Sequence, residues 1–255
     1  MKNILFSWVV FCATMLAAAC VNAPTALLAD TPIPPTSTVT PTATIVWFPP
    51  TPTDTPAPTP VITPTLDLKP KIGALLFEDQ FKDGASWMLS QSENSSIALG
   101  VNEITLAISL PKTYLFTLRK EPQLDNFYLV ITATPNLCLA DDEYGVLFRF
   151  SPQQEFYRLG LTCDGQIHLD RYLQNRPTMI YPKTYSGAVP PGAPSQSKIE
   201  IWTSSNQIVV FVNQQYQFTI NESAIKSGSL GLFARTGSHD ALTVNFSDLK
   251  VYQVK

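Results

Sequence analysis

Residues 72–255 form a succession of short apolar or alternating segments separated by turn residues, and this pattern constrains the fold most strongly. Alternation with a period of two is typical of half-buried strands. No segment keeps a helical period, and residues 223–226 form at most one helical turn. The pattern predicts an all-β fold, an antiparallel sandwich or jelly roll. The predicted strands cover residues 97–108, 114–119, 127–133, 144–150, 155–162, 166–173, 198–203, 207–213, 215–220, 229–234 and 242–252.

Two consecutive hairpins can be placed in register from their loops. The loop 151–154 pairs Phe148 with Tyr157, and the Asp-Gly turn that follows pairs Leu159 with Leu169. A slip of one residue would move every side chain to the opposite face, so the agreement of both registers is informative. The predicted inner face consists of Val146, Phe148, Phe150, Tyr157, Leu159, Leu161, Ile167 and Leu169.

A third hairpin turns at residues 213–214. Its register predicts that Phe211 pairs with Tyr216 and that Val209 pairs with Phe218.

The first twenty residues have the layout of a secretory signal peptide. Lys2 is followed by an uncharged, mostly apolar run over 4–19 that ends in small residues before Cys20. The run resembles a bacterial lipoprotein signal, whose cysteine becomes the lipidated first residue of the mature protein. The resemblance implies a lipid on Cys20 that anchors the chain to the outer face of the cell membrane. A plain secretory signal or an uncleaved anchor is the alternative, because Ala17 stands where such signals more often carry leucine.

A linker follows the cysteine. Residues 21–70 contain 13 of the 22 prolines and 13 threonines. Proline fixes φ and lacks an amide donor, so we expect a disordered, extended polyproline II spacer that reaches roughly 150 Å. The predicted domains are a signal peptide over 1–19, the lipidated cysteine and linker over 20–71, and one sandwich domain over 72–255.

The charge of the chain excludes one class of partner. Seventeen basic and 20 acidic residues give a net charge of −3. The chain therefore has no excess of positive charge with which to bind nucleic acid or anionic lipid. Attachment to a membrane must therefore come from the lipid on Cys20.

Two cysteines remain in the predicted domain, Cys138 and Cys163. An even pair in an extracytoplasmic protein predicts a disulfide, which would close a loop of roughly 25 residues and contribute about 3 kcal/mol. Two separate free thiols are the alternative. A zinc site is not expected, since the histidines are limited to His168 and His239 and no paired Cys-x-x-Cys occurs.

Several segments together resemble the concanavalin-like jelly roll. They are residues 145–149, 156–159, 164–171, 228–233 and 244–252. More narrowly, they are similar to the laminin-G-like and family-16-glycoside-hydrolase-like domains of bacterial surface proteins. With the signal and the linker, the chain resembles surface lipoproteins of Chloroflexi-type bacteria. The resemblance implies carbohydrate as a ligand, but fold alone does not settle activity.

The catalytic motif of the active jelly-roll family is missing from the sequence. That family carries Glu-x-Asp-x-x-Glu on one strand, where alternation aims the acids at one cleft. Here residues 141–143 are acidic but consecutive, and we interpret them as a solvated loop. A non-catalytic module is therefore expected, and a glycoside hydrolase with dispersed acids is the alternative.

The outer face of the two hairpins is the candidate binding site. Rings stack on the C–H faces of sugars, while guanidinium and carboxylate groups bond to hydroxyls. The registers place Arg158 opposite Asp170 and Arg149 opposite Phe156. An ordinary solvated face with one cross-strand ion pair is the alternative. The candidate ligand-binding residues are Arg149, Phe156, Arg158, His168, Asp170 and Tyr172.

Four aspartates, Asp79, Asp83, Asp240 and Asp248, are candidate oxygen ligands for a structural calcium ion. No contiguous calcium loop is present, so we interpret them as turn caps and expect no cofactor. The 173–197 segment is predicted to be a long loop that covers a sheet edge or a ligand site.

The sequence thus predicts a surface lipoprotein that presents a non-catalytic module for carbohydrate or another surface ligand. A purely structural or adhesive domain without a small-molecule site is a further alternative.

Overall fold

The computed structural model describes residues 71–238 and 241–254. The predictions for the signal peptide, Cys20 and the linker up to residue 70 lie outside these residues, as do His239 and Asp240. Within the described ranges, no helix is long and apolar enough to span a membrane.

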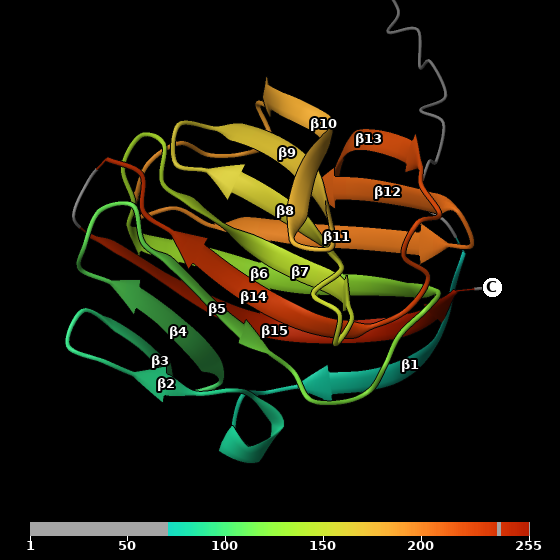
Figure 1. The fold of residues 1–255 in the computed structure, drawn as a ribbon, viewed down its shortest axis with the longest axis horizontal. Helices are drawn as coiled ribbons and strands as arrows, with labels where there is room; N and C mark the ends of the chain where they lie inside the picture. The colour runs from blue at the N-terminus through green and yellow to red at the C-terminus, as the bar shows by residue number, and fades with distance from the viewer. Residues whose placement is uncertain (1–70, 239–240, 255) are drawn as a thin grey trace, which may run out of the picture. The chain divides into compact units, whose positions relative to one another are not determined.

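Two antiparallel sheets lie one over the other and form a sandwich (Figure 1). One sheet has nine strands in the order β13-β12-β11-β6-β15-β4-β3-β2, with β1 also paired to β15, and the other has six in the order β10-β9-β8-β7-β14-β5. The structure therefore confirms the predicted all-β sandwich. The strands of the first sheet are β1 (Ile72–Asp79), β2 (Ser90–Gln91), β3 (Ser95–Leu99), β4 (Glu103–Ile108), β6 (Phe127–Leu137), β11 (Ser197–Ser204), β12 (Gln207–Val212), β13 (Gln215–Asn221) and β15 (Leu242–Val254). Those of the second are β5 (Tyr114–Leu118), β7 (Glu143–Phe150), β8 (Phe156–Thr162), β9 (Gln166–Leu173), β10 (Arg176–Tyr185) and β14 (Ser229–Arg235).

The apolar core lies between the two sheets. Alternate residues of each strand point inward, as in β4, where Ile104, Leu106 and Ile108 are buried and the residues between them are partly exposed. The inward side chains of both sheets join into one cluster, which includes Phe127 and Phe246. Burial of this apolar surface is the main stabilising contribution to such a sandwich.

The hairpin registers of the second sheet are as predicted. Phe148 pairs with Tyr157, and Leu159 pairs with Leu169. Arg158 stands opposite Asp170 on the other face. The loop lengths between β7, β8 and β9 were sufficient to set these pairings.

The prediction for Arg149 and Phe150 was wrong, because a β-bulge lies at this point. The register between β7 and β14 shifts between the Ser229 and Gly231 pairs, and Arg149 has a φ of 53°. The extra residue exchanges the two faces. Arg149 is buried on the inner side, and Phe150 packs on the outer side beside Phe156.

A second register shift corrects the 213–214 hairpin. Phe211 pairs with Tyr216 as predicted, but the shift that follows pairs Val210 with Phe218 and Val209 with Thr219. The predicted Val209–Phe218 pair is therefore wrong.

The predicted loop 173–197 contains a strand. Strand β10 extends the edge of the six-stranded sheet through its pairing with β9. Two register shifts in this ladder explain why its sequence does not alternate cleanly. The strands β1 and β2 were also missed, and the predicted segment 97–108 is divided between β3 and β4.

The structure confirms the disulfide between Cys138 and Cys163. Their Cα atoms lie 5.6 Å apart, and the bond closes a sequence separation of 25 residues. Both residues are buried in the main core. The disulfide links the segment that leads into β7 with the turn between β8 and β9.

Candidate functional site

A hollow of about 330 Å³ lies on the outer face of the six-stranded sheet. Ligand pockets for small molecules begin at about this size. Three of the six predicted ligand-binding residues, Phe156, Arg158 and Tyr172, line it. The full lining is Tyr114, Phe116, Leu147, Phe150, Gln154, Phe156, Arg158, Tyr172 and Asn175.

Stacked aromatic rings form one wall of the hollow. The Phe156 and Tyr172 rings lie nearly parallel, with centroids 4.4 Å apart and an interplanar angle of 10°. Phe150 stacks on the other side of Phe156 at 4.9 Å, and Phe116 follows at 6.3 Å from Phe150. The adjacent strands β9, β8 and β7 present Tyr172, Phe156 and Phe150 at outward positions, and β5, which lies beyond β14, adds Phe116 to the row. The row offers a continuous apolar surface to a ligand.

Arg158 supplies the charge of the hollow and is held in place by Asp170. Its Nε and Nη2 atoms donate to a single oxygen, Asp170 Oδ2, at 3.1 and 2.6 Å. The guanidinium also lies 5.3 Å from the Tyr172 ring centroid and 5.5 Å from that of Phe233. Burial by itself lowers the pKa of Arg158, but the bond to Asp170 raises it above its usual value. Arg158 is therefore a fixed positive charge.

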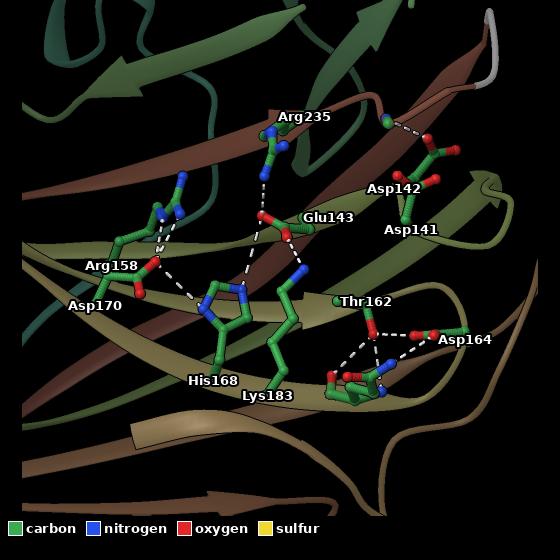
Figure 2. A network of polar contacts seen from close by, with 12 residues as sticks. Asp141, Asp142, Glu143, Arg158, Thr162, Asp164, His168, Asp170, Lys183 and Arg235 are labelled. Carbon is green, nitrogen blue, oxygen red and sulfur yellow. Dashed lines mark hydrogen bonds and ion pairs between the residues drawn. The ribbon is translucent and has the colours of Figure 1, made fainter. Parts of the chain in front are cut away.

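A chain of polar contacts extends from this pair across the sheet (Figure 2). His168 lies between two carboxylates, with Nδ1 3.3 Å from Asp170 Oδ2 and Nε2 3.7 Å from Glu143 Oε2. The imidazole covers Gly160, its partner across β8 and β9, where any larger residue would overlap the ring. Burial lowers the pKa of His168, whereas Asp170 and Glu143 raise it, and the net shift is upward.

Glu143 ends this chain beneath two cations. Lys183 Nζ lies 2.5 Å from Oε1 of Glu143, and the Nη1 atom of Arg235 lies 3.2 Å from Oε2. Burial raises the pKa of Glu143, but His168 and Lys183 bring it far below its ordinary range. Asp170 behaves alike: burial raises its pKa, and His168 with Arg158 lowers it overall. Both acids are thus ionised.

The prediction that residues 141–143 form a solvated loop was wrong for two of the three. Asp142 and Glu143 are fully buried. Asp142 accepts hydrogen bonds from the backbone N–H groups of Leu139 and Gly237, at 2.9 and 2.8 Å, and so ties two loops together. Glu143 begins β7 and belongs to the polar chain described above.

Arg149 has a different role from the one predicted. Its Nε and Nη2 atoms donate to the carbonyl of Asp125 at 3.1 and 2.8 Å, and Nη1 donates to that of Ile225 at 2.9 Å. It therefore joins two loops on the inner side of the sheet and does not reach the hollow. Tyr157, also on the inner side, accepts a hydrogen bond from the N–H of Ile225 at 3.1 Å.

The described aspartates of the predicted calcium set have protein partners. Asp79 accepts from Trp87 Nε1 at 3.0 Å and from Arg119 Nε at 2.9 Å. Asp83 caps the short 3₁₀ turn Gly84–Ser86, and the hydroxyl of Ser247 donates to Asp248. These contacts favour the interpretation as caps, and the expected absence of a cofactor stays a prediction.

Sequence reasoning missed two of the four rings of the aromatic wall, Phe116 and Phe150, and the neighbouring Tyr114. Tyr114 and Phe116 belong to β5, which reaches the site only through its pairing with β14, far along the chain. Their alternation with Leu118 was the available signal: three large apolar side chains on one face of a predicted strand. Phe150 was missed because of the bulge. Gln154 and Asn175 lie in the turns that border the hollow.

No protein-family model matches the chain, and no curated protein matches it. Solved structures do resemble it. A β-glucanase of Bacillus licheniformis matches with a TM-score of 0.55 at 11% identity, over 72% of this chain and 100% of that one. A protein of unknown function with a galectin-like fold from Bacillus subtilis gives the same TM-score and identity, over 72% and 99%. The carbohydrate-binding module CBM66 of Bacillus subtilis matches with a TM-score of 0.51 at 11% identity, over 66% and 96%. At these identities the likeness concerns the fold, which is a concanavalin-like jelly roll.

Proposed function

We propose that this protein is a cell-surface lipoprotein whose sandwich domain binds carbohydrate, without cleaving it, in the hollow on the six-stranded sheet. One observation carries the proposal: a row of stacked rings borders a hollow that also contains an anchored arginine. Two of the solved structures named above, a carbohydrate-binding module and a glucanase, support it by fold.

The hollow fits the two-sided chemistry of a sugar. The C–H face of a pyranose ring is apolar and packs on the apolar surface formed by the outward edges of the stacked rings, Phe156 and Tyr172 among them. The hydroxyls at its edge need planar donors and acceptors, which Arg158, Gln154 and Asn175 supply. Because Asp170 fixes the guanidinium before a ligand arrives, little ordering entropy is lost on binding.

The state of the nearby acids supports binding rather than hydrolysis. A glycosidase needs a general acid with a raised pKa that reaches the glycosidic oxygen. Glu143 and Asp170 are buried, hold ion pairs with cations, and have lowered pKa values. Neither is suited to deliver a proton.

A glycan array tests the proposal directly. The wild-type chain is expected to bind a subset of glycans, and Phe156→Ala and Tyr172→Ala are each expected to weaken that binding at least about tenfold, as the loss of a stacked ring does. Tyr216→Ala removes an exposed ring from the nine-stranded sheet and serves as the matched control. Glycan binding that survives both Phe156→Ala and Tyr172→Ala would exclude this hollow as the binding site. Release of reducing sugar would support the hydrolase, and absence of binding to any glycan would support a structural or adhesive domain.

Anchoring through Cys20 is tested separately. We expect Cys20→Ala to abolish acyl labelling and membrane association. Unchanged labelling would refute the lipoprotein part of the proposal and leave the binding site unaffected.

A further inference from the structure

The charged groups of the outer face are divided by sign between the surface and the interior. Of the residues that line the hollow, Arg158 alone is charged. Of the further ion-pair members on this face, Lys183 and Arg235 have side chains that are 35% and 42% exposed, whereas the carboxylates Glu143 and Asp170 are 0% and 4% exposed. The Arg158 side chain is 11% exposed and borders the hollow, so a ligand there meets this cation while the paired carboxylates lie beneath.

The charges do not cancel. Three permanent cations, Arg158, Lys183 and Arg235, share two carboxylates through the contacts described above. His168 lies between these carboxylates and adds positive charge when it is protonated. The cluster keeps an excess of at least one positive charge, and its exposed side carries that excess.

We propose that the hollow selects acidic glycans, with a carboxylate or sulfate group of the sugar placed against the Arg158 side of the aromatic wall. This inference rests on the proposed function and names its ligand class. A guanidinium among aromatic rings, partly shielded from water, binds an anionic oxygen more strongly than a hydroxyl. Lys183 of β10 and Arg235 of β14 lie on the same face. In a longer glycan, they attract the acidic sugar units next to the one in the hollow.

Two pairs of polymers, each with an acidic and a neutral form of the same sugar backbone, test the inference. Polygalacturonate is compared with its methyl-esterified form, and dextran sulfate with dextran, by isothermal titration calorimetry on the wild-type protein. We expect the acidic member of at least one pair to bind about tenfold more tightly or better than its neutral partner. The pair that shows the difference identifies carboxylate or sulfate as the recognised group.

Two further measurements distinguish a specific preference for acidic glycans from nonspecific binding and from the misfolding of a variant. The preference of the wild-type protein is expected to shrink as salt is raised, which needs no variant. Arg158→Gln is expected to abolish the preference, whereas Lys198→Gln, which removes an exposed cation from the nine-stranded sheet, is expected to preserve it.

The outcomes distinguish the two proposals. Equal binding of the charged and neutral polymers, still weakened by Phe156→Ala, overturns the acidic preference and leaves glycan binding in place. An acidic preference that persists in folded Arg158→Gln overturns the role of this arginine. No binding to these polymers or to any array glycan overturns both proposals.

Discussion

The His168 imidazole occupies the space above Gly160 that any other residue at position 160 would fill with its side chain. The two residues are directly opposed across β8 and β9. This absence of a Cβ lets the imidazole reach both Glu143 and Asp170. A single glycine thus creates the room in which the polar chain behind the hollow is assembled.

Gly160→Ala is expected to lower the free energy of unfolding by about 1–3 kcal/mol, the usual cost of overpacking. The added methyl group would overlap the His168 ring and displace it from its carboxylates. Thermal and urea unfolding measure the change. Gly187→Ala is the matched control, because nothing lies within 4 Å of a Cβ at that position. Equal stability of the two variants would contradict the packing described for His168.

Arg149→Met is expected to lower the free energy of unfolding by about 3 kcal/mol, because the buried carbonyl of Ile225 and the partly buried carbonyl of Asp125 would lose a charged donor. Arg176→Met, at an exposed position of β10, is expected to change stability little. Comparison of their urea midpoints checks the prediction. A loss of ligand binding without a loss of stability would instead restore Arg149 to the binding site.

The stability contributed by His168 is expected to fall as the pH rises. Although burial lowers its pKa, Asp170 and Glu143 raise it above the ordinary value of 6.5. A group whose pKa is raised on folding stabilises fully below its unfolded-state pKa, and this contribution is lost as the pH passes the higher folded-state value. Wild type and His168→Gln are compared by thermal unfolding from about pH 5 to about pH 9. The advantage of the wild type is expected to be largest at the acidic end, and a constant difference would refute the ion-pair role of His168.

Loss of the disulfide is expected to cost about 3 kcal/mol, since a closed loop of this length restricts the unfolded chain by about that amount. The double variant Cys138→Ala, Cys163→Ala and the reduced wild type should therefore unfold at similar denaturant concentrations. A reducing agent should leave the double variant unchanged. Wild-type protein that unfolds identically with and without reduction would show that the bond contributes nothing.

Much of the fold could be predicted because alternation and loop length are local. The pairing of Phe148 with Tyr157 followed from a four-residue loop, and it placed Arg158 opposite Asp170 correctly. The disulfide followed from an even number of cysteines. The hairpin signals concern residues close in sequence, and the disulfide needed only a count of the cysteines.

The rest depended on contacts that local patterns do not encode. Tyr114 reaches the hollow because β5 joins the six-stranded sheet through β14. Glu143 is buried because Lys183 and Arg235, from strands distant in the sequence, meet it there. Strand β10 was missed because its ladder contains two register shifts. The prediction from strict alternation failed at Arg149, because the partner strand β14 as well as the sequence of β7 determines where a bulge forms.

The bulge at Arg149 lets one strand serve both the interior and the binding surface at consecutive positions. Because the extra residue is taken up in the bulge, the Phe150 ring stays on the wall of the hollow while the Arg149 guanidinium points inward. Removal of Arg149 would restore strict alternation and leave Phe150 opposite Ser229 on the outer side, with the aromatic row intact. A related chain one residue shorter at this point would therefore keep the aromatic row and lose the guanidinium that joins the loops of Asp125 and Ile225.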